Sequence, residues 1–251
     1  LDANDPMQLG DPIASGSDAF TIPIQNGLFN DQQGLGGIFG LGLTGLMNNG
    51  DPNPNWLDWH DDRGVGPNPD DVLGGAPGLM TSHMTSGTAN GSSNDQEKGY
   101  QYGVQTSTAT GEFTVSGNLI NFDSALQLYG NTAAVGGELG LFIGDGTQSN
   151  FIKFVINTNG LSALQEINDI PQTPINVPIP VPNRPDAVIF YFRVNPSTGL
   201  VTLEYSLDGG ARQVAGNITA QGSILTAIQQ ANTDLIVGFI GTSNTAGVEL
   251  E

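Results

Sequence analysis

The chain has 251 residues, in which 25 acidic side chains outnumber 6 basic ones and give a formal net charge of -19. A surface this negative repels phosphate backbones and anionic lipids, so we expect no nucleic-acid partner and no insertion into a membrane. The absence of cysteine excludes disulfide frameworks, thiolate metal sites and cysteine nucleophiles. With 36 glycines, 15 prolines and only 12% charged residues, the composition favours strands joined by many turns over a helical bundle.

Residues 1–19 are expected to form a linker that leads into a single domain over residues 20–249. The linker begins Leu-Asp-Ala-Asn-Asp-Pro, which resembles the Asp-x-Asn-Asp linker by which cadherin-like repeats share calcium between neighbouring domains. Oxygen ligands on a short extended segment suit a hard cation. The resemblance implies calcium ligands at Asp2, Asn4 and Asp5. A polar segment of Asx turns without metal is the alternative.

Short strands are expected along most of the domain. Two of them, residues 20–24 and 37–47, precede a long acidic loop insertion over residues 48–99 that is dense in Asp, Asn, Gly and Pro. Further strands are predicted at residues 100–104, 112–119, 124–129, 137–144, 150–156, 187–194, 200–206 and 235–240. Many short strands at this spacing predict an all-β fold, an antiparallel β-sandwich.

Turn residues and one helical pattern divide these strands. Hairpin turns are expected at residues 144–147, 195–199 and 208–210, where Gly, Asp, Asn and Pro cluster. Residues 171–185 are rich in proline and are expected to form a loop. Residues 223–231 have apolar side chains at helical spacing and predict one short helix.

The second half of the chain resembles a known family of sandwich modules. Residues 137–156 (GELGLFIGDGTQSNFIKFVI) are similar to the hairpin Gly-x-Phe-Ile-Gly-x-Gly-x-Gln-x-Asn-Tyr-Ile-Lys of bacterial concanavalin A-like or laminin G-like modules. Residues 190–194, 203–210 and 237–243 fit the same pattern. The resemblance covers residues 100–248 and implies a jelly-roll sandwich. Such modules occur in the calcium-dependent ligand-binding regions of RTX adhesins, which implies an extracellular, cell-surface location.

An acidic segment, DPNPNWLDWHDDR, begins at Asp51. Asp51, Asn53 and Asn55 stand at positions one, three and five, whose oxygens converge on one calcium ion in an EF-hand. The full EF-hand pattern fails, because Trp56 occupies the position that needs glycine and Asp62 replaces the bidentate glutamate. The segment is therefore expected to be a calcium loop of another kind.

Six carboxylates lie between residues 51 and 71 beside one basic residue, and they would repel one another without a counterion. We therefore expect Ca²⁺ in this loop, with a solvated acidic loop as the alternative. The expected metal ligands of the segment are Asp51, Asn53, Asn55, Asp58, Asp61, Asp62, Asp70 and Asp71.

The acidic segment also holds both tryptophans of the chain. A flat aromatic ring beside oriented polar groups and calcium is a common way to build a sugar or peptide site. We expect Trp59, His60 and Arg63 to contact such a ligand. The alternative is that the tryptophans only pin the loop to the sandwich.

Three functions follow from these observations. The first is a non-catalytic, calcium-dependent module of a bacterial adhesin, which binds a glycan or exposed peptide end on another cell or surface beside neighbouring domains of the same long chain. The second is a calcium-stiffened scaffold between such domains. The third is a glycoside hydrolase, but the mid-strand carboxylates Glu138 and Glu204 are isolated from each other in the sequence. Because the serine-elbow, P-loop and dinucleotide motifs are also absent, we expect no enzyme.

Overall fold

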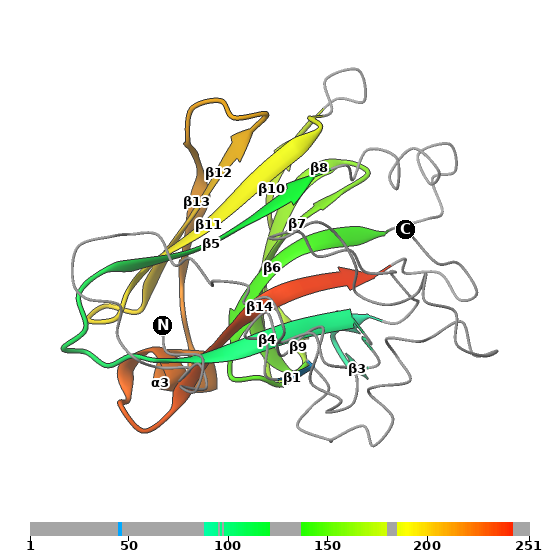
Figure 1. Ribbon diagram of the computed structural model, residues 1–251. Coiled ribbons are helices and arrows are strands. Elements are labelled where there is room, and N and C mark those ends of the chain that lie inside the picture. The colour runs from blue at the N-terminus through cyan, green and yellow to red at the C-terminus, as the bar shows by residue number, and fades with distance from the viewer. Residues whose placement is uncertain are drawn as a thin grey trace, which may run out of the picture.

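In a computed structural model of the chain, the placement of residues 45–46, 88–94, 96, 98–120, 137–179 and 185–242 is described. These residues form two antiparallel sheets that pack against each other, with one helix at one end (Figure 1). The predicted all-β antiparallel sandwich is therefore confirmed. The described part of the chain contains no helix that is long and apolar enough to cross a membrane.

The larger sheet has eight strands, seven of which follow the order β1-β4-β14-β6-β7-β8-β10, while β9 pairs with β8. All described neighbours in this sheet run antiparallel. In chain order the strands are β1 (Gly45–Leu46), β4 (Lys98–Gln105), β6 (Glu138–Gly144), β7 (Asn150–Asn157), β8 (Gly160–Ile167), β9 (Ile170–Pro171), β10 (Ile175–Pro178) and β14 (Asp234–Thr242).

The smaller sheet has four strands in the order β13-β12-β11-β5. They are β5 (Phe113–Ile120), β11 (Ala187–Asn195), β12 (Leu200–Leu207) and β13 (Gln213–Thr219). A separate two-stranded hairpin consists of β2 (Ala89–Asn90) and β3 (Ser93–Asn94).

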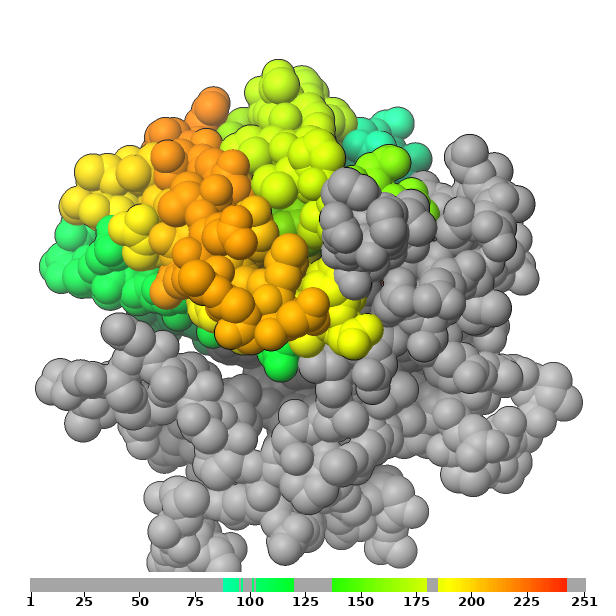
Figure 2. All heavy atoms as spheres, turned by 90° about the horizontal axis from the view of Figure 1, so that it is seen from above, coloured from blue at the N-terminus to red at the C-terminus, as the bar shows by residue number. Residues whose placement is uncertain are grey.

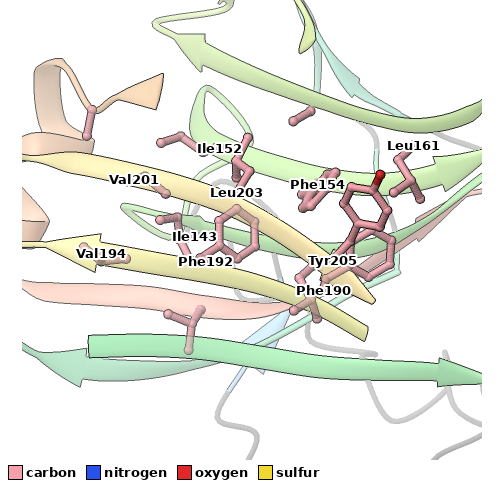
Figure 3. Close-up of a cluster of buried hydrophobic side chains, with 14 of the residues drawn as sticks. Ile143, Ile152, Phe154, Leu161, Phe190, Phe192, Val194, Val201, Leu203 and Tyr205 are labelled. Atoms are coloured by element: carbon pink, nitrogen blue, oxygen red, sulfur yellow. The ribbon is translucent and has the colours of Figure 1, made fainter. Parts of the chain in front are cut away.

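The main core lies between the two sheets. Along β11 buried and half-buried residues alternate, and Phe190 and Phe192 are fully buried on the side that faces the larger sheet. The ring of Phe154 on β7 meets both of them edge-on, with ring centroids 4.8 Å and 6.4 Å apart (Figure 3). Because a slip of one residue would turn these rings outward, this packing favours the observed register of β11 with β12 and β5.

A smaller core lies on the other face of the larger sheet. Its buried members are Ala89, Phe142, Phe151, Val155 and Ile240. Ala89 belongs to the β2–β3 hairpin, which therefore covers part of this face. Strand β7 is consequently buried on both faces, which explains why its sequence is an almost continuous apolar run.

Helix α3 (Gly222–Gln229) packs at one end of the sandwich through Ile224, Ala227 and Ile228. The hydroxyl of Ser223 donates to the carboxylate of Asp145 at 2.6 Å. Asp145 also accepts the backbone N–H of Thr147 at 2.9 Å. Asp145 therefore stabilises the β6–β7 turn, as expected for an aspartate in a hairpin turn, and also binds the first turn of the helix.

The described strands agree with most of the predicted ones, and the three predicted hairpin turns join β6 to β7, β11 to β12 and β12 to β13. The helix is also confirmed. Residues 171–185 were expected to be a loop, and this was wrong for β10. Among the described strands, β10 pairs only with β8 and ends the strand order of the larger sheet, a position where proline is tolerated.

Strands β8, β9 and β13 were not predicted, and neither was the β2–β3 hairpin at the end of the acidic insertion. In β8 the apolar residues do not alternate strictly, because Leu164 follows Ala163 directly. The predicted strands at residues 20–24 and 124–129, most of residues 37–47 and the boundaries of the domain lie outside the described residues.

Candidate functional site

The residues that the sequence analysis assigned to calcium or to a ligand all lie outside the described residues. Their roles therefore stay predictions. The calcium candidates are Asp2, Asn4, Asp5, Asp51, Asn53, Asn55, Asp58, Asp61, Asp62, Asp70 and Asp71. The ligand candidates are Trp59, His60 and Arg63. Within the described ranges, no group of three or more His, Asp or Glu side chains is arranged to hold a metal ion.

The described residues contain a different candidate for a binding site, on the outward face of the smaller sheet. Because side chains alternate along a strand, the burial of Phe190 and Phe192 turns Tyr191 and Arg193 outward. Tyr191 stands opposite Glu204 on β12, so these two side chains share the outward face. Residues of β12 and β13, coloured yellow-orange to orange, form part of the molecular surface in Figure 2.

Arg212 completes this group from the segment just before β13. Its guanidinium carbon lies 4.1 Å from the centroid of the Tyr191 ring, which is a cation–π contact. The same guanidinium forms an ion pair with Glu204. Arg212 thus bridges an aromatic ring on β11 and a carboxylate on β12. We call Tyr191, Arg193, Glu204 and Arg212 the polar face.

Glu204 is held from two sides. The Nε atom of Arg193 lies 3.4 Å from one carboxylate oxygen of Glu204, and Arg212 contacts the other oxygen. Arg193 also donates from Nη1 to Glu112 at 3.2 Å. The hydrogen bond to Glu112, with a smaller contribution from Glu204, raises the pKa of Arg193 above its ordinary value. The Arg193 guanidinium is therefore charged at every physiological pH.

Burial differs sharply within the polar face. Glu204 is only 8% exposed, whereas the side chains of Arg193 and Arg212 are 38% and 41% exposed. The carboxylate is thus fixed beneath two guanidinium groups that remain open to solvent. Two of the six basic residues of the chain gather here, so the polar face is far less negative than the chain as a whole.

The arrangement suits binding better than acid–base catalysis. Hydrolysis of a glycoside by a carboxylate pair needs two carboxyl groups that face each other across the scissile bond. Glu204 is instead paired with arginines, and Glu138 lies on the other sheet, where it forms an ion pair with Lys153. The expected isolation of Glu138 and Glu204 from each other is confirmed.

In the sequence, Glu204 stands out only as an isolated carboxylate, and its neighbours in the polar face were not predicted. One signal was available, because the run Phe190-Tyr191-Phe192-Arg193 alternates strictly and so places Tyr191 and Arg193 on one face. Arg212 carried no such signal. It reaches Tyr191 only because β13 folds back beside β12.

No family model matches the chain, and no curated protein matches it either. Several solved structures are similar in fold. The glycoside hydrolase family 43 protein BlXynB of Bacillus licheniformis has 12% identity and a TM-score of 0.47 over 70% of this chain and 31% of its own. Lectin II of Ulex europaeus has 14% identity and a TM-score of 0.38, over 71% of this chain and 86% of the lectin chain.

A functionally unknown protein of Saccharomyces cerevisiae has 11% identity and a TM-score of 0.45 over 68% of this chain and 80% of its own. The chain spans less than a third of the length of the Bacillus licheniformis protein.

Proposed function

We propose that this chain is a non-catalytic binding module that holds a glycan on the polar face of its smaller sheet. The observation that carries the proposal is the fixed position of Arg212, which lies against the ring of Tyr191 while it pairs with Glu204. This contact places an aromatic ring and charged donors, held by a buried carboxylate, within one small area.

A neutral sugar is the ligand that best complements this area. Each sugar hydroxyl can accept a hydrogen bond, so neighbouring hydroxyls match the N–H groups of two arginines whose side chains are 38% and 41% exposed. The apolar face of a sugar ring can pack against the Tyr191 ring beside Arg212, since aromatic side chains line many binding sites. A strongly anionic ligand is less suitable, because the chain carries a net charge of -19.

The proposal includes two further parts that rest on the sequence. Calcium, bound in the acidic segment at residues 51–71 and in the linker, is proposed to stabilise the module. The setting is proposed to be a bacterial cell-surface adhesin, in which the module is extracellular, lies between neighbouring domains of a long chain and attaches the cell to glycans on another surface.

The test is a glycan array probed with the wild-type chain and with the Tyr191→Ala variant, with and without calcium. We expect hits from neutral glycans that Tyr191→Ala loses. Ile170→Ala is the control, because Ile170 is 62% exposed on β9 of the other sheet. If the array stays blank, or if Tyr191→Ala binds like the wild type, the polar face is not the binding site. If peptide ends bind on a parallel peptide array and glycans do not, the ligand is a peptide rather than a glycan.

A further inference from the structure

A second unusual feature lies on the opposite sheet, where the β2–β3 hairpin meets β8. Glu166 faces outward from the larger sheet beside Phe151 on β7 and is fully buried. One of its carboxylate oxygens, Oε2, accepts the backbone N–H of Gly91 in the hairpin turn at 2.9 Å. The hairpin therefore covers a glutamate that no part of the polar face uses.

The other carboxylate oxygen of Glu166 is not accounted for by protein groups. Glu166 Oε1 is buried and has no hydrogen-bond partner within the described structure. Buried carboxylate oxygens are almost always partnered, since an unpaired one loses its hydration without compensation. A group that accounts for this oxygen has to be a donor or a cation.

A second buried oxygen lies at the same junction. Asn94 on β3 donates from Nδ2 to Asp169 Oδ1 at 3.0 Å, which leaves its own Oδ1 buried and without a partner in the described residues. Asn94 pairs with Ala89, whose side chain is packed onto the sheet, so Asn94 faces the sheet too. Asp169 follows Glu166 in the turn between β8 and β9.

The charges at this junction do not balance. Lys153 on β7 is 6% exposed and its ammonium forms an ion pair with Glu138. That ion pair is neutral by itself, so it does not offset the two carboxylates at the junction, those of Glu166 and Asp169. Burial raises the pKa of Glu166, and the Gly91 N–H and the charge of Lys153 offset part of that effect. A bound cation would act in the same direction as those two groups.

We infer that a calcium ion binds between the β2–β3 hairpin and the β8–β9 turn, with Glu166 Oε1, Asn94 Oδ1 and the Asp169 carboxylate as its protein ligands. Calcium accepts carboxylate, amide and water oxygens together in flexible geometry, so two carboxylates and one amide are a suitable protein share of its shell. Asn94 and Asp169 are half-buried, which leaves the ion a route from solvent. The ion ties the hairpin to the sandwich.

The site is tested by calorimetric titration of the full chain, stripped with EDTA, with calcium chloride alone. Glu166→Gln and Asp169→Asn keep the size of each side chain, and the amide oxygen that Glu166→Gln introduces can still accept the Gly91 N–H. We expect each variant to lose one calcium or to bind it about tenfold or more weakly, because ligand charge determines calcium affinity. Asp234→Asn, which alters an exposed carboxylate on β14, is the control for the charge change and should bind as the wild type does.

Hydrogen exchange of the hairpin amides gives a second readout that does not depend on counting ions. Calcium should slow exchange at Gly91 in the wild type and in Asp234→Asn, but not in Glu166→Gln. The inference is overturned if the wild type binds no calcium, or if both site variants bind as many ions as tightly as the wild type. The acidic segment is distinguished by Asp51→Ala with Asp58→Ala, which should leave the Glu166 site intact. Failure of this site leaves the glycan proposal untouched, because the polar face lies on the other sheet.

Discussion

The guanidinium of Arg212 lies 4.1 Å from the centre of the Tyr191 ring while it also pairs with Glu204. Each of these three residues comes from a different stretch of the smaller sheet, so their contact depends on the pairing of β11 with β12 and of β12 with β13. The carboxylate is buried beneath the arginines and holds them in place. The result is an aromatic ring with charged donors arranged beside it before any ligand arrives.

Replacement of Arg212 by alanine should weaken glycan binding more than it weakens the fold. The lost cation–π contact and the ion pair both involve an exposed side chain, so we expect the free energy of unfolding to fall by only about 1 kcal/mol or less. Glycan affinity, measured by calorimetry with a ligand identified on the array, should fall at least severalfold. Arg212→Lys tests the geometry, because lysine keeps the charge but loses the planar guanidinium. Equal binding by all three proteins would contradict the proposed role.

Tyr191→Phe should retain most of the glycan affinity that Tyr191→Ala loses. The aromatic ring, rather than the hydroxyl, is proposed to support the sugar, and such a contact contributes on the order of 1 kcal/mol. Titration of both variants with the same glycan measures the difference. A Tyr191→Phe variant as weak as Tyr191→Ala would show that the hydroxyl carries the interaction.

Glu204→Ala should destabilise the smaller sheet moderately. Without the carboxylate, the guanidinium groups of Arg193 and Arg212 lose their shared partner and repel each other, so we expect a loss of about 1 to 2 kcal/mol. Urea denaturation followed by circular dichroism measures it. The double variant Glu204→Ala with Arg212→Ala should lose less than the sum of the two single variants, and strict additivity would show that the two residues are not coupled.

Chelation of calcium should lower the melting temperature by several degrees, because an ion bound only to the native state stabilises that state. Asp51→Ala combined with Asp58→Ala should reproduce part of this loss in calcium-containing buffer. Thermal melts with and without EDTA measure both effects. If chelation leaves the melting temperature unchanged, calcium does not stabilise the module as proposed.

In calcium-free buffer, Glu166 should make the stability of the chain depend on pH. Burial raises its pKa in the folded state above the ordinary value of 4.5. A raised pKa means that its contribution to stability is complete below the unfolded pKa and is lost as the pH rises through the folded value. Glu166→Gln cannot ionise, so its free energy of unfolding relative to the wild type should increase as the pH rises above the ordinary pKa of 4.5. A difference between the two proteins that stays constant as the pH rises would contradict the prediction.

The sequence alone determined the class of the fold and much of its local order. The alternation of Phe190, Tyr191, Phe192 and Arg193 identified a strand and its two faces, and the glycine- and aspartate-rich turns identified three hairpins. These features were predictable because a strand repeats every two residues and a turn depends on its own few residues. Where the pattern was irregular, as in β8, or where prolines lay in a strand, as in β10, local reasoning failed.

Only the tertiary structure decided which side chains meet. Arg212 reaches Tyr191 through two strand pairings, and Gly91 covers Glu166 across 75 positions of the chain. Nothing local in either segment indicates the other, because such contacts depend on the order of strands in the sheets and on the packing of the hairpin over the outer face of β7 and β8. Composition showed that the chain is acidic and rich in oxygen ligands. The fold then placed a nearly neutral polar face on the smaller sheet. On the outer face of the larger sheet it buried the carboxylate of Glu166 beneath the β2–β3 hairpin.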